Sequence, residues 1–255
     1  MKPIIEFVDV YYRYPGQPRF ALQGFSVQVP AGEKIAVIGR NGSGKSTFFL
    51  HCNGLYRPQA GAVFYDGKPL DYSRAGLQTL RRHVGICFQN PDDQLFSASV
   101  AQDISFGPLN LGLKDSEARR RVEQAAEFCD VTGLLDRPTH ALSGGEKARV
   151  ALAGVLAMDP DVIIVDELMS TLDPWVRLHI IAIFERLHRH GKTLMLATHD
   201  LTVVESWATY VIVMAAGRTL FAGSPATLLS DAALLHETGL EHVWSRAGEW
   251  TAVSL

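Results

Sequence analysis

The sequence predicts an α/β domain that is interrupted by a helical insertion. Short apolar strands and helical segments alternate before residue 90 and after residue 145, a pattern typical of α/β folds. Residues 162–165 are a run of branched apolar side chains, as expected for a parallel strand buried on both faces. From Pro91 to about His140 no strand pattern is evident, and residues 116–129 carry apolar side chains at helical spacing.

The elements before the insertion begin with a β-branched and aromatic segment, which favours a strand. A continuous apolar strand later leads into a glycine-rich turn, and a helix should follow that turn. The predicted elements are, in order, strands at 4–14, 25–29 and 34–38, a helix from Lys45 to about Asn53, and strands at 63–65 and 84–88.

After the insertion the alternation of helices and strands resumes. Pro174 suits the first turn of a helix, and Gly191 suits the cap at its end. The predicted elements are a helix at 145–158, the strand 162–165, a helix at 175–190, a strand at 193–197, and a hairpin of 211–214 with 218–221. The tail from Ser224 should be short and partly helical.

Composition limits the class of protein. The chain has 255 residues, 47% hydrophobic and 20% charged, which is the balance of a globular protein. Its net charge of −3 provides no basic field for nucleic acid or anionic lipid. The three cysteines lack metal-ligand spacing and are expected to be reduced thiols. Because no apolar run reaches roughly 18 residues and no signal peptide is evident, we expect a cytosolic protein that reaches a membrane only through an embedded partner.

The glycine-rich turn carries the first chemical motif. Residues 39–46 match the pattern G-x-x-x-x-G-K-[ST] in full, between a predicted strand and a predicted helix. Glycines let backbone N–H groups turn inward around a phosphate, and the start of the helix adds partial positive charge. Lys45 is expected to bridge the β- and γ-phosphates, and the Ser46 hydroxyl to bind Mg²⁺. The predicted nucleotide-binding residues are Gly39, Asn41, Gly42, Ser43, Gly44, Lys45, Ser46 and Thr47.

Two carboxylates follow the buried strand 162–165. In P-loop ATPases an aspartate at this position holds Mg²⁺, which predicts that role for Asp166. Glu167 comes next and can accept a proton from the attacking water. Alone, the pair would equally fit an acidic loop after a strand, but beside a complete phosphate-binding motif the catalytic interpretation is favoured.

A second anion-binding turn is predicted where Leu142-Ser143-Gly144-Gly145-Glu146 opens a helix. This motif resembles the signature motif of ABC ATPases, and the three motifs occur in the order typical of that superfamily. The resemblance covers residues 4–230. It implies a P-loop NTPase (RecA-like) core with an antiparallel β subdomain and an inserted ABC α-helical subdomain at about 90–145, within an ATPase domain 1–230 that is followed by a short tail, 231–255.

Further positions match the same family. The resemblance implies roles for Gln89 as the Q-loop glutamine, Asp173 in the D-loop 170–173, His199 as the switch histidine, and Tyr14 as the ring that stacks on adenine. Tyr11 and Tyr12 are rivals for the role of Tyr14.

The resemblance also implies a mechanism. ABC ATPases act as head-to-tail dimers with two ATP molecules at the interface, and a homodimer is favoured here because all motifs are intact in one chain. One subunit offers the phosphate-binding loop with the catalytic residues Glu167, His199 and Gln89. The other subunit offers Ser143, Gly144 and Gly145. The implied cofactors are ATP and Mg²⁺, with Ser46, Gln89 and Asp166 as the Mg²⁺ ligands.

Two stretches of sequence indicate which type of ABC ATPase the chain resembles. Residues 88–96, FQNPDDQLF, and 106–113, FGPLNLGL, resemble the ATPase subunits of energy-coupling-factor importers, most closely the cobalt and nickel branch. The resemblance implies a transmembrane coupling protein docked near 89–96, a substrate-binding membrane protein in the same complex, and a peripheral position on the cytoplasmic face of the membrane. Leu95 and Phe96 are expected to line the docking groove; the alternative is that they belong to the core of the insertion.

The chain departs from the family pattern at four positions, Glu146, Leu168, Met169 and Thr171. The last three lie beside Glu167, so the geometry of the catalytic loop is in question; the carboxylate of Glu146 is expected to turn away from the phosphates. Three alternatives stay open. They are an ATPase of another ABC transporter (a vitamin importer, a binding-protein-dependent importer or an exporter), a soluble non-transport ABC ATPase, and a nucleotide sensor without turnover.

Overall fold

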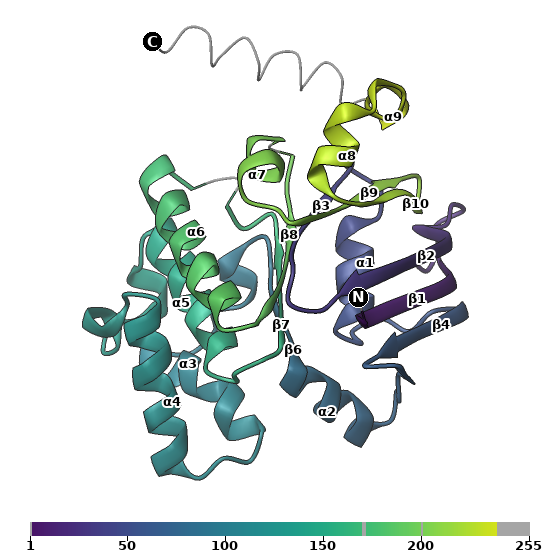
Figure 1. Ribbon diagram of the computed structural model, residues 1–255. Helices are drawn as coiled ribbons and strands as arrows, with labels where there is room; N and C mark the ends of the chain where they lie inside the picture. Colours follow the sequence, from purple (N-terminus) through teal and green to yellow (C-terminus); the bar gives the residue numbers. More distant parts are fainter. Residues whose placement is uncertain (1, 170–171, 200, 239–255) are drawn as a thin grey trace, which may run out of the picture. The chain divides into compact units, whose positions relative to one another are not determined.

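The computed structural model describes residues 2–169, 172–199 and 201–238. It divides the chain into two compact units, of which the first consists of Met1–Tyr72 and Met195–Leu255 and the second of Ser73–Leu194. The chain passes between the units after Tyr72 and again within β8, Thr193–Ala197. Each unit has its own layers of strands and helices, labelled in Figure 1.

An antiparallel sheet begins the first unit. Its strands, in the order β2-β1-β4-β5, are Leu22–Pro30, Pro3–Tyr12, Ala60–Tyr65 and Lys68–Pro69. Alternate residues of β1 and β2 are buried, as the period of a strand requires. Phe7 packs edge-on against Phe25 of β2 and against Phe48 of the helix α1, Lys45–Cys52, with ring centroids 5.5 and 5.0 Å apart. This aromatic contact attaches the sheet to α1.

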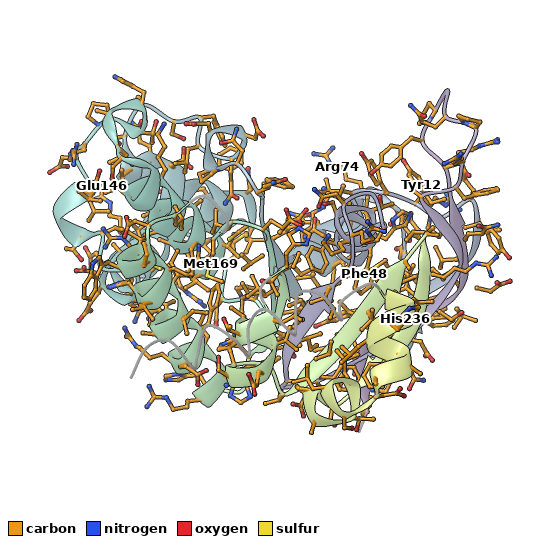
Figure 2. All side chains as sticks on the ribbon, turned by 90° about the horizontal axis from the view of Figure 1, so that it is seen from above. Tyr12, Phe48, Arg74, Glu146, Met169 and His236 are labelled. Carbon is orange, nitrogen blue, oxygen red and sulfur yellow. The ribbon has the colours of Figure 1, made fainter. Side chains whose placement is uncertain are left out.

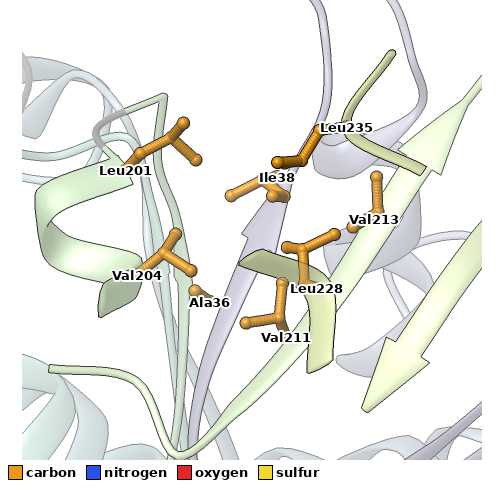
Figure 3. Packing of buried hydrophobic residues seen from close by; sticks show 8 residues of the cluster. All are labelled: Ala36, Ile38, Leu201, Val204, Val211, Val213, Leu228 and Leu235. Atoms are coloured by element: carbon orange, nitrogen blue, oxygen red, sulfur yellow. The ribbon is translucent and has the colours of Figure 1, made fainter. Parts of the chain in front are cut away.

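A second set of strands in the first unit leads to the phosphate-binding motif. The strand β3 (Lys34–Ile38) pairs in parallel with β9 (Tyr210–Ala215), and β9 forms an antiparallel hairpin with β10 (Arg218–Gly223). The helices α7 (Leu201–Ser206), α8 (Pro225–Ser230) and α9 (Ala232–Thr238) cover these strands. Figure 3 shows the resulting apolar cluster, which consists of Ala36, Ile38, Leu201, Val204, Val211, Val213, Leu228 and Leu235.

The second unit contains the parallel strands β6 (Val84–Cys87) and β7 (Val162–Asp166), and all of β7 is buried. Its helices are α2 (Arg74–His83), α3 (Val100–Asn110), α4 (Asp115–Phe128), α5 (Gly144–Leu156) and α6 (Pro174–Arg189). Three 3-10 turns, Pro91–Asp93, Thr132–Leu134 and Thr139–Ala141, complete it. The helix α5 packs against both α3 and α4.

The structure confirms the predicted order of strands and helices. Residues 91–140 contain helices and 3-10 turns and, within that range, no strand. The helix α2 was not predicted, and β1 ends at Tyr12, so that Tyr14 lies in the following loop. In the described part of the chain, no helix has both the length and the apolar character needed to cross a bilayer.

Candidate functional site

The loop between β3 and α1 carries the predicted phosphate-binding residues. Its Ser43 N–H donates to the Arg40 carbonyl oxygen at 3.0 Å, which closes a turn. The Gly217 N–H, from the turn between β9 and β10, donates to the Ser43 carbonyl oxygen at 2.9 Å. Asn41 and Gly42, at the tip of the loop, are exposed. Main-chain hydrogen bonds therefore fix the shape of the loop from two sides.

The start of α1 is open to a ligand. Gly44 is the N-cap residue, with φ 108° and ψ 7°, and no side chain caps the helix. A Cβ at Gly44 would lie 2.6 Å from the Ala21 carbonyl oxygen, in a backbone conformation that L-residues rarely adopt. Because the first N–H groups of a helix have no partner within the helix, these amides can hold an anion.

The next residues of α1 add charge and a hydroxyl to this opening. The Lys45 side chain is only 6% exposed, and its Nζ donates to the Gly39 carbonyl oxygen at 2.8 Å. Ser46 is exposed, whereas Thr47 is buried. The lysine charge consequently lies against the glycine-rich loop, where it would strengthen hydrogen bonds to a phosphate.

Tyr14 is joined to α1 through its hydroxyl group, which lies 3.0 Å from Thr47 Oγ1. Its ring contacts Tyr12 and Tyr56 edge-on, with centroids 5.3 and 5.6 Å away. Tyr12, labelled in Figure 2, is buried, and burial together with the neighbouring tyrosines raises its pKa. The ring of Tyr11 instead contacts Phe20. Of the three rival tyrosines, Tyr14 is the one that lines a pocket of about 410 Å³ in this loop.

His199 follows β8 and is exposed. The N–H of the preceding Thr198 donates to the carbonyl oxygen of Val37 on β3 at 3.2 Å. The segment with His199 therefore leaves the strands beside the end of β3, the same end from which the phosphate-binding loop departs. Within the first unit, the histidine and this loop emerge from neighbouring strands.

In the second unit, two predicted site segments that are far apart in sequence meet at the end of β7. Asp166 is the last residue of β7 and is 8% exposed. Glu167 follows with φ 49°, a left-handed conformation that is uncommon for a residue with a side chain. Gln89 Nε2 donates to Glu167 Oε2 at 3.5 Å, a long hydrogen bond. An unusual backbone conformation of this kind is often maintained at functional sites.

The departures from the family pattern after Glu167 lie in the core. Leu168 and Met169 are 1% and 5% exposed, and Met169 is labelled in Figure 2. Their burial anchors the segment that follows the catalytic candidate. Ser170 and Thr171, which belong to the predicted D-loop, lie outside the described residues.

The start of α5 is capped by its own side chains. Ser143 is the N-cap, and its Oγ accepts a hydrogen bond from the Glu146 N–H at 3.4 Å. Glu146 Oε2 accepts from the Ser143 N–H at 2.7 Å, and Arg137 Nη1 donates to Glu146 Oε1 at 2.9 Å. The hydrogen bonds from Ser143, and then the nearby Arg137, lower the pKa of the Glu146 carboxyl. This reciprocal pair is a complete capping box.

The signature residues lie beside the end of the D-loop. A Cβ at Gly145 would come within 2.8 Å of Val176 Cγ2, so α5 and α6 approach each other closely at their first turns. Asp173 caps α6, since its Oδ1 accepts from the N–H groups of Trp175 and Val176, both at 3.0 Å. Nothing lies within 4 Å of the Cβ position at Gly144.

Comparison with known proteins identifies the chain. A family model described as ABC transporter matches residues 22–170, more than half of the sequence. The chain belongs to the ABC transporter family. It is 46% identical over 238 residues to the energy-coupling factor transporter ATP-binding protein EcfA of Methanothermobacter thermautotrophicus, covering 93% of this chain and 76% of that protein. It is 45% identical over 240 residues to the cobalt import ATP-binding protein CbiO of Rhodobacter capsulatus, covering 94% and 85%.

Solved structures agree with this identification. The structure of cbiO1 from Clostridium perfringens, part of the ABC transporter complex cbiONQ, matches with a TM-score of 0.82 and 39% identity over 99% of this chain and 100% of that chain. A dimeric ATP-binding cassette with bound ADP and Pi matches with a TM-score of 0.78 and 23% identity, over 87% and 98%, which supports the fold alone. The predicted P-loop NTPase fold and the predicted ATPase activity are thereby confirmed for this ABC ATPase.

The predicted site residues of this ABC ATPase fall into two groups, one in each unit. The first unit brings together the phosphate-binding loop, Tyr14 and the strand end that carries His199. The second unit brings Gln89 and Asp166 to Glu167, and the signature residues 143–145 to Asp173. The roles assigned to these residues from the resemblance stay predictions.

Three residues with clear structural roles were not predicted for this ABC ATPase. Gln94 Oε1 accepts from the Phe88 N–H at 3.2 Å, and Gln94 Nε2 donates to the Ala151 carbonyl oxygen at 2.9 Å, so it links the Q-loop to the signature helix. Arg137 fixes the capping glutamate. Gln59 hydrogen-bonds to the loop before Tyr14. Only Gln94 has a sequence signal, its place in the run 88–96.

The candidate Mg²⁺ ligands suit the ion chemically. Ser46, Gln89 and Asp166 offer a hydroxyl, an amide and a carboxylate oxygen, the donors that hard cations prefer. Among the described residues no cluster of three or more His, Cys, Asp or Glu side chains could hold a metal. Mg²⁺ bound to a nucleotide normally has water and phosphate oxygens as further ligands.

Proposed function

We propose that this ABC ATPase drives an energy-coupling-factor importer for cobalt or nickel ions. The single observation that carries the proposal is its 45% identity to a cobalt import ATP-binding protein over 94% of the chain. The 46% identity to an energy-coupling factor ATP-binding protein supports the same type of importer.

The first unit provides the phosphate-binding half of the site. The open amides at the start of α1 and the Lys45 ammonium group hold the β- and γ-phosphates. Tyr14 stacks on the adenine ring, and His199 contacts the γ-phosphate. Positioning and charge neutralisation supply most of the catalysis in phosphoryl transfer, because the transition state needs little covalent help from the protein.

The second unit provides the general base. Glu167 accepts a proton from the attacking water, while the Gln89 amide, 3.5 Å from its carboxylate, keeps that carboxylate oriented. Asp166, Gln89 and Ser46 would hold Mg²⁺. When bound, the ion would neutralise charge on the phosphate oxygens.

A second copy of the chain completes each site in a head-to-tail homodimer. Its Ser143, Gly144 and Gly145 face the γ-phosphate, and Asp173 lies beside them. In the capping box the Ser143 oxygen accepts a hydrogen bond, so its own hydroxyl proton stays available for donation to a phosphate oxygen. ATP thus joins the two subunits, and hydrolysis separates them.

An exposed apolar patch of the second unit would bind a transmembrane coupling protein. We define the docking patch as Phe96, Phe106 and Leu109, which are 65%, 49% and 46% exposed. Phe96 and Phe106 contact each other edge-to-face at 4.7 Å. The buried Asp103 carboxylate accepts from the Phe96 and Ser97 N–H groups at 3.0 and 2.8 Å, which fixes the patch in place. Such an exposed apolar patch suits the apolar face of a helix, and this contact would hold the ATPase at the cytoplasmic face beside a substrate-binding membrane protein.

The proposal is tested by isolating the complex. The tagged chain is purified from membranes of its native host in mild detergent, and the co-purified proteins are identified. ATP-dependent uptake of radioactive Co²⁺ and Ni²⁺ is then measured in proteoliposomes. We expect a coupling protein and a substrate-binding membrane protein, and metal uptake that disappears with Glu167→Gln. Uptake of a vitamin but of neither metal would overturn the substrate, and a permease of another class would overturn the importer type.

The docking patch has its own test. Replacing Phe96 and Phe106 with alanine should reduce co-purification of the coupling protein about ten-fold or more, since buried aromatic anchors dominate interfaces. Leu55→Ala, a replacement of a 43% exposed apolar residue in the first unit, is the matched control. Equal recovery of the partner with all variants would contradict the assignment of the patch.

A further inference from the structure

The loop that carries Tyr14 is fastened to β4 by one glutamine side chain. Gln59 Oε1 accepts a hydrogen bond from the Arg13 N–H at 3.1 Å, and Gln59 Nε2 donates to the Arg13 carbonyl oxygen at 3.0 Å. The Gln59 main-chain N–H donates to the Tyr11 carbonyl oxygen at 2.8 Å. The side-chain amide therefore pairs with Arg13 as a peptide group of a neighbouring strand would, although β1 has already ended at Tyr12.

Other bonds complete the support of this loop. The Gln17 N–H donates to the Tyr14 carbonyl oxygen at 3.1 Å, closing a turn through Gly16, whose φ is 75°. The Ala21 N–H donates to the Tyr12 carbonyl oxygen at 2.8 Å. At the far end of the ring, the Tyr14 hydroxyl meets Thr47 on α1. The ring is thus held at its tip by the phosphate-binding helix and at its base by Gln59 through Arg13.

A pocket opens on this loop. It has a volume of about 410 Å³ and is lined by residues 13–18 and by Gln59. Its side chains include Arg13, Gln17 and Gln59 but no carboxylate, so it does not repel an anionic nucleotide. It belongs entirely to the first unit, as do the phosphate-binding loop and α1.

We propose that Gln59 is a positioning residue for the nucleotide base: by pairing with the main chain of Arg13 it holds the Tyr14 ring ready to stack on a purine. The inference rests on the proposed role of Tyr14. Gln59 acts through the backbone of its neighbour and touches neither the phosphates nor the catalytic carboxylate. Its removal should weaken nucleotide binding and leave the chemical step unchanged.

The chemistry of the link explains why glutamine is needed. Arg13 presents one donor and one acceptor, and a primary amide is the side-chain group that satisfies both in a planar arrangement. Glutamate offers only acceptors, so Gln59→Glu would keep the bond from the Arg13 N–H and lose the bond to its carbonyl oxygen. Because stacking uses the face of the base, ATP and GTP should be affected alike.

The experiment measures KM and kcat for the hydrolysis of ATP and GTP by the full chain with Mg²⁺. Losing two partly exposed hydrogen bonds should raise KM of Gln59→Ala about five-fold, with kcat within about two-fold of the parent. The KM of Gln59→Glu should lie between the KM of the parent and that of Gln59→Ala. Tyr14→Ala should raise KM about ten-fold or more, since stacking on one base is worth that much. Inorganic tripolyphosphate, which has no base, should inhibit the parent and Gln59→Ala with the same constant.

Gln28→Ala is the matched control, because Gln28 is an exposed glutamine of the same sheet whose Nε2 bonds to Glu6 at 2.8 Å. Its KM should equal that of the parent. If Tyr14→Ala raises KM and Gln59→Ala does not, the inference fails while the role of Tyr14 stands. If neither raises KM, both fail. If Gln59→Ala weakens tripolyphosphate binding or lowers kcat as much as it raises KM, Gln59 supports the whole unit and the inference is overturned.

Discussion

The helices α1 and α5 both begin at a Ser-Gly pair in a turn suited to an anion, yet their first turns are capped differently. The N-cap of α1 is Gly44, which has no side chain to cap the helix. The N-cap of α5 is Ser143, which shares a full capping box with Glu146, and Arg137 holds that glutamate in turn. One helix start has no side-chain cap, and the other is capped by its own residues.

The difference indicates a division of labour between the two halves of the nucleotide site. At α1 no side chain caps the main-chain amides, so this turn can bind a phosphate directly. At α5 the capping box engages the N–H groups of Ser143 and Glu146, so the Ser143 hydroxyl proton and the N–H groups of Gly144 and Gly145 are the groups left to donate. We therefore expect the first half to bind ATP by itself, and the second half, on a partner subunit, to recognise ATP that is already bound.

Replacing one lysine on each helix should give the largest contrast. Lys45→Ala should weaken ATP binding on the order of 100-fold, because it removes a charged partner of the phosphates. Lys147→Ala on α5 breaks an ion pair with Asp92 (2.6 Å) and should leave ATP affinity unchanged. Isothermal titration of the isolated chain with ATP measures both. Equal losses in the two variants would contradict the difference between the helices.

Replacing a glycine with alanine at the start of each helix should affect the stability of the protein differently. Gly44→Ala forces a left-handed conformation and a contact 2.6 Å from the Ala21 carbonyl oxygen, so we expect about 2 kcal/mol or more of destabilisation. At Gly144, in the first turn of α5, no atom lies within 4 Å of the Cβ position, and Gly144→Ala should be neutral or stabilising by up to about 1 kcal/mol.

Urea unfolding of the two glycine variants measures these changes. In the proposed homodimer, Gly144→Ala should nevertheless lower turnover, because the methyl group would face the γ-phosphate bound by the partner subunit. A stable Gly144→Ala variant with parental turnover would remove Gly144 from the interface.

The capping box predicts a smaller effect that depends on pH. The pKa of Glu146 is lowered in the folded state, so its contribution to stability is fully present above the unfolded value of 4.5 and is lost progressively as the pH falls through the lower folded-state pKa. Glu146→Gln should cost about 1 kcal/mol or less at pH 7 and nothing at low pH. Urea unfolding at pH 7 and pH 4 tests this against Glu123→Gln, a change on the exposed face of α4. The same cost at both pH values would contradict the ionic capping.

The other end of α1 should give the smallest effect. His51 is fully buried, its Nδ1 donates to the Thr47 carbonyl oxygen at 2.7 Å, and its Nε2 has no partner among the described residues. Burial lowers its pKa below 6.5, so the unfolded chain takes up a proton first as the pH falls. Stability should therefore decline below about pH 6.5, and less so in His51→Gln. The exposed His140→Gln serves as the control; a parental decline in both variants would exclude His51 as the cause.

The motif residues of this chain are easier to predict from the sequence than the elements and side chains that hold them in place. The phosphate-binding loop can be predicted because its glycines, at a fixed spacing, permit the tight backbone turn that a phosphate needs. The strand β7 can be predicted because a strand buried on both faces requires a run of apolar residues. The helix α2 escapes prediction because it is strongly polar and buries only Leu80, so it offers few apolar residues to reveal its period. The helix α3 contains Pro108, which ordinarily ends a helix. No sequence pattern indicates the role of Gln59, because its side chain bonds to the main chain of Arg13, and the two residues come together only when β1 and β4 pair.

We propose that ATP, bound at the uncapped start of α1, joins two copies of the chain through the capped start of α5. Sedimentation velocity of the Glu167→Gln variant, with and without Mg-ATP, tests it most directly. We expect a monomer without nucleotide, a dimer with ATP, and a return to monomer when Ser143 is also replaced by arginine. A Glu167→Gln variant that binds ATP and stays monomeric, or a dimer unaffected by the change at Ser143, would contradict it.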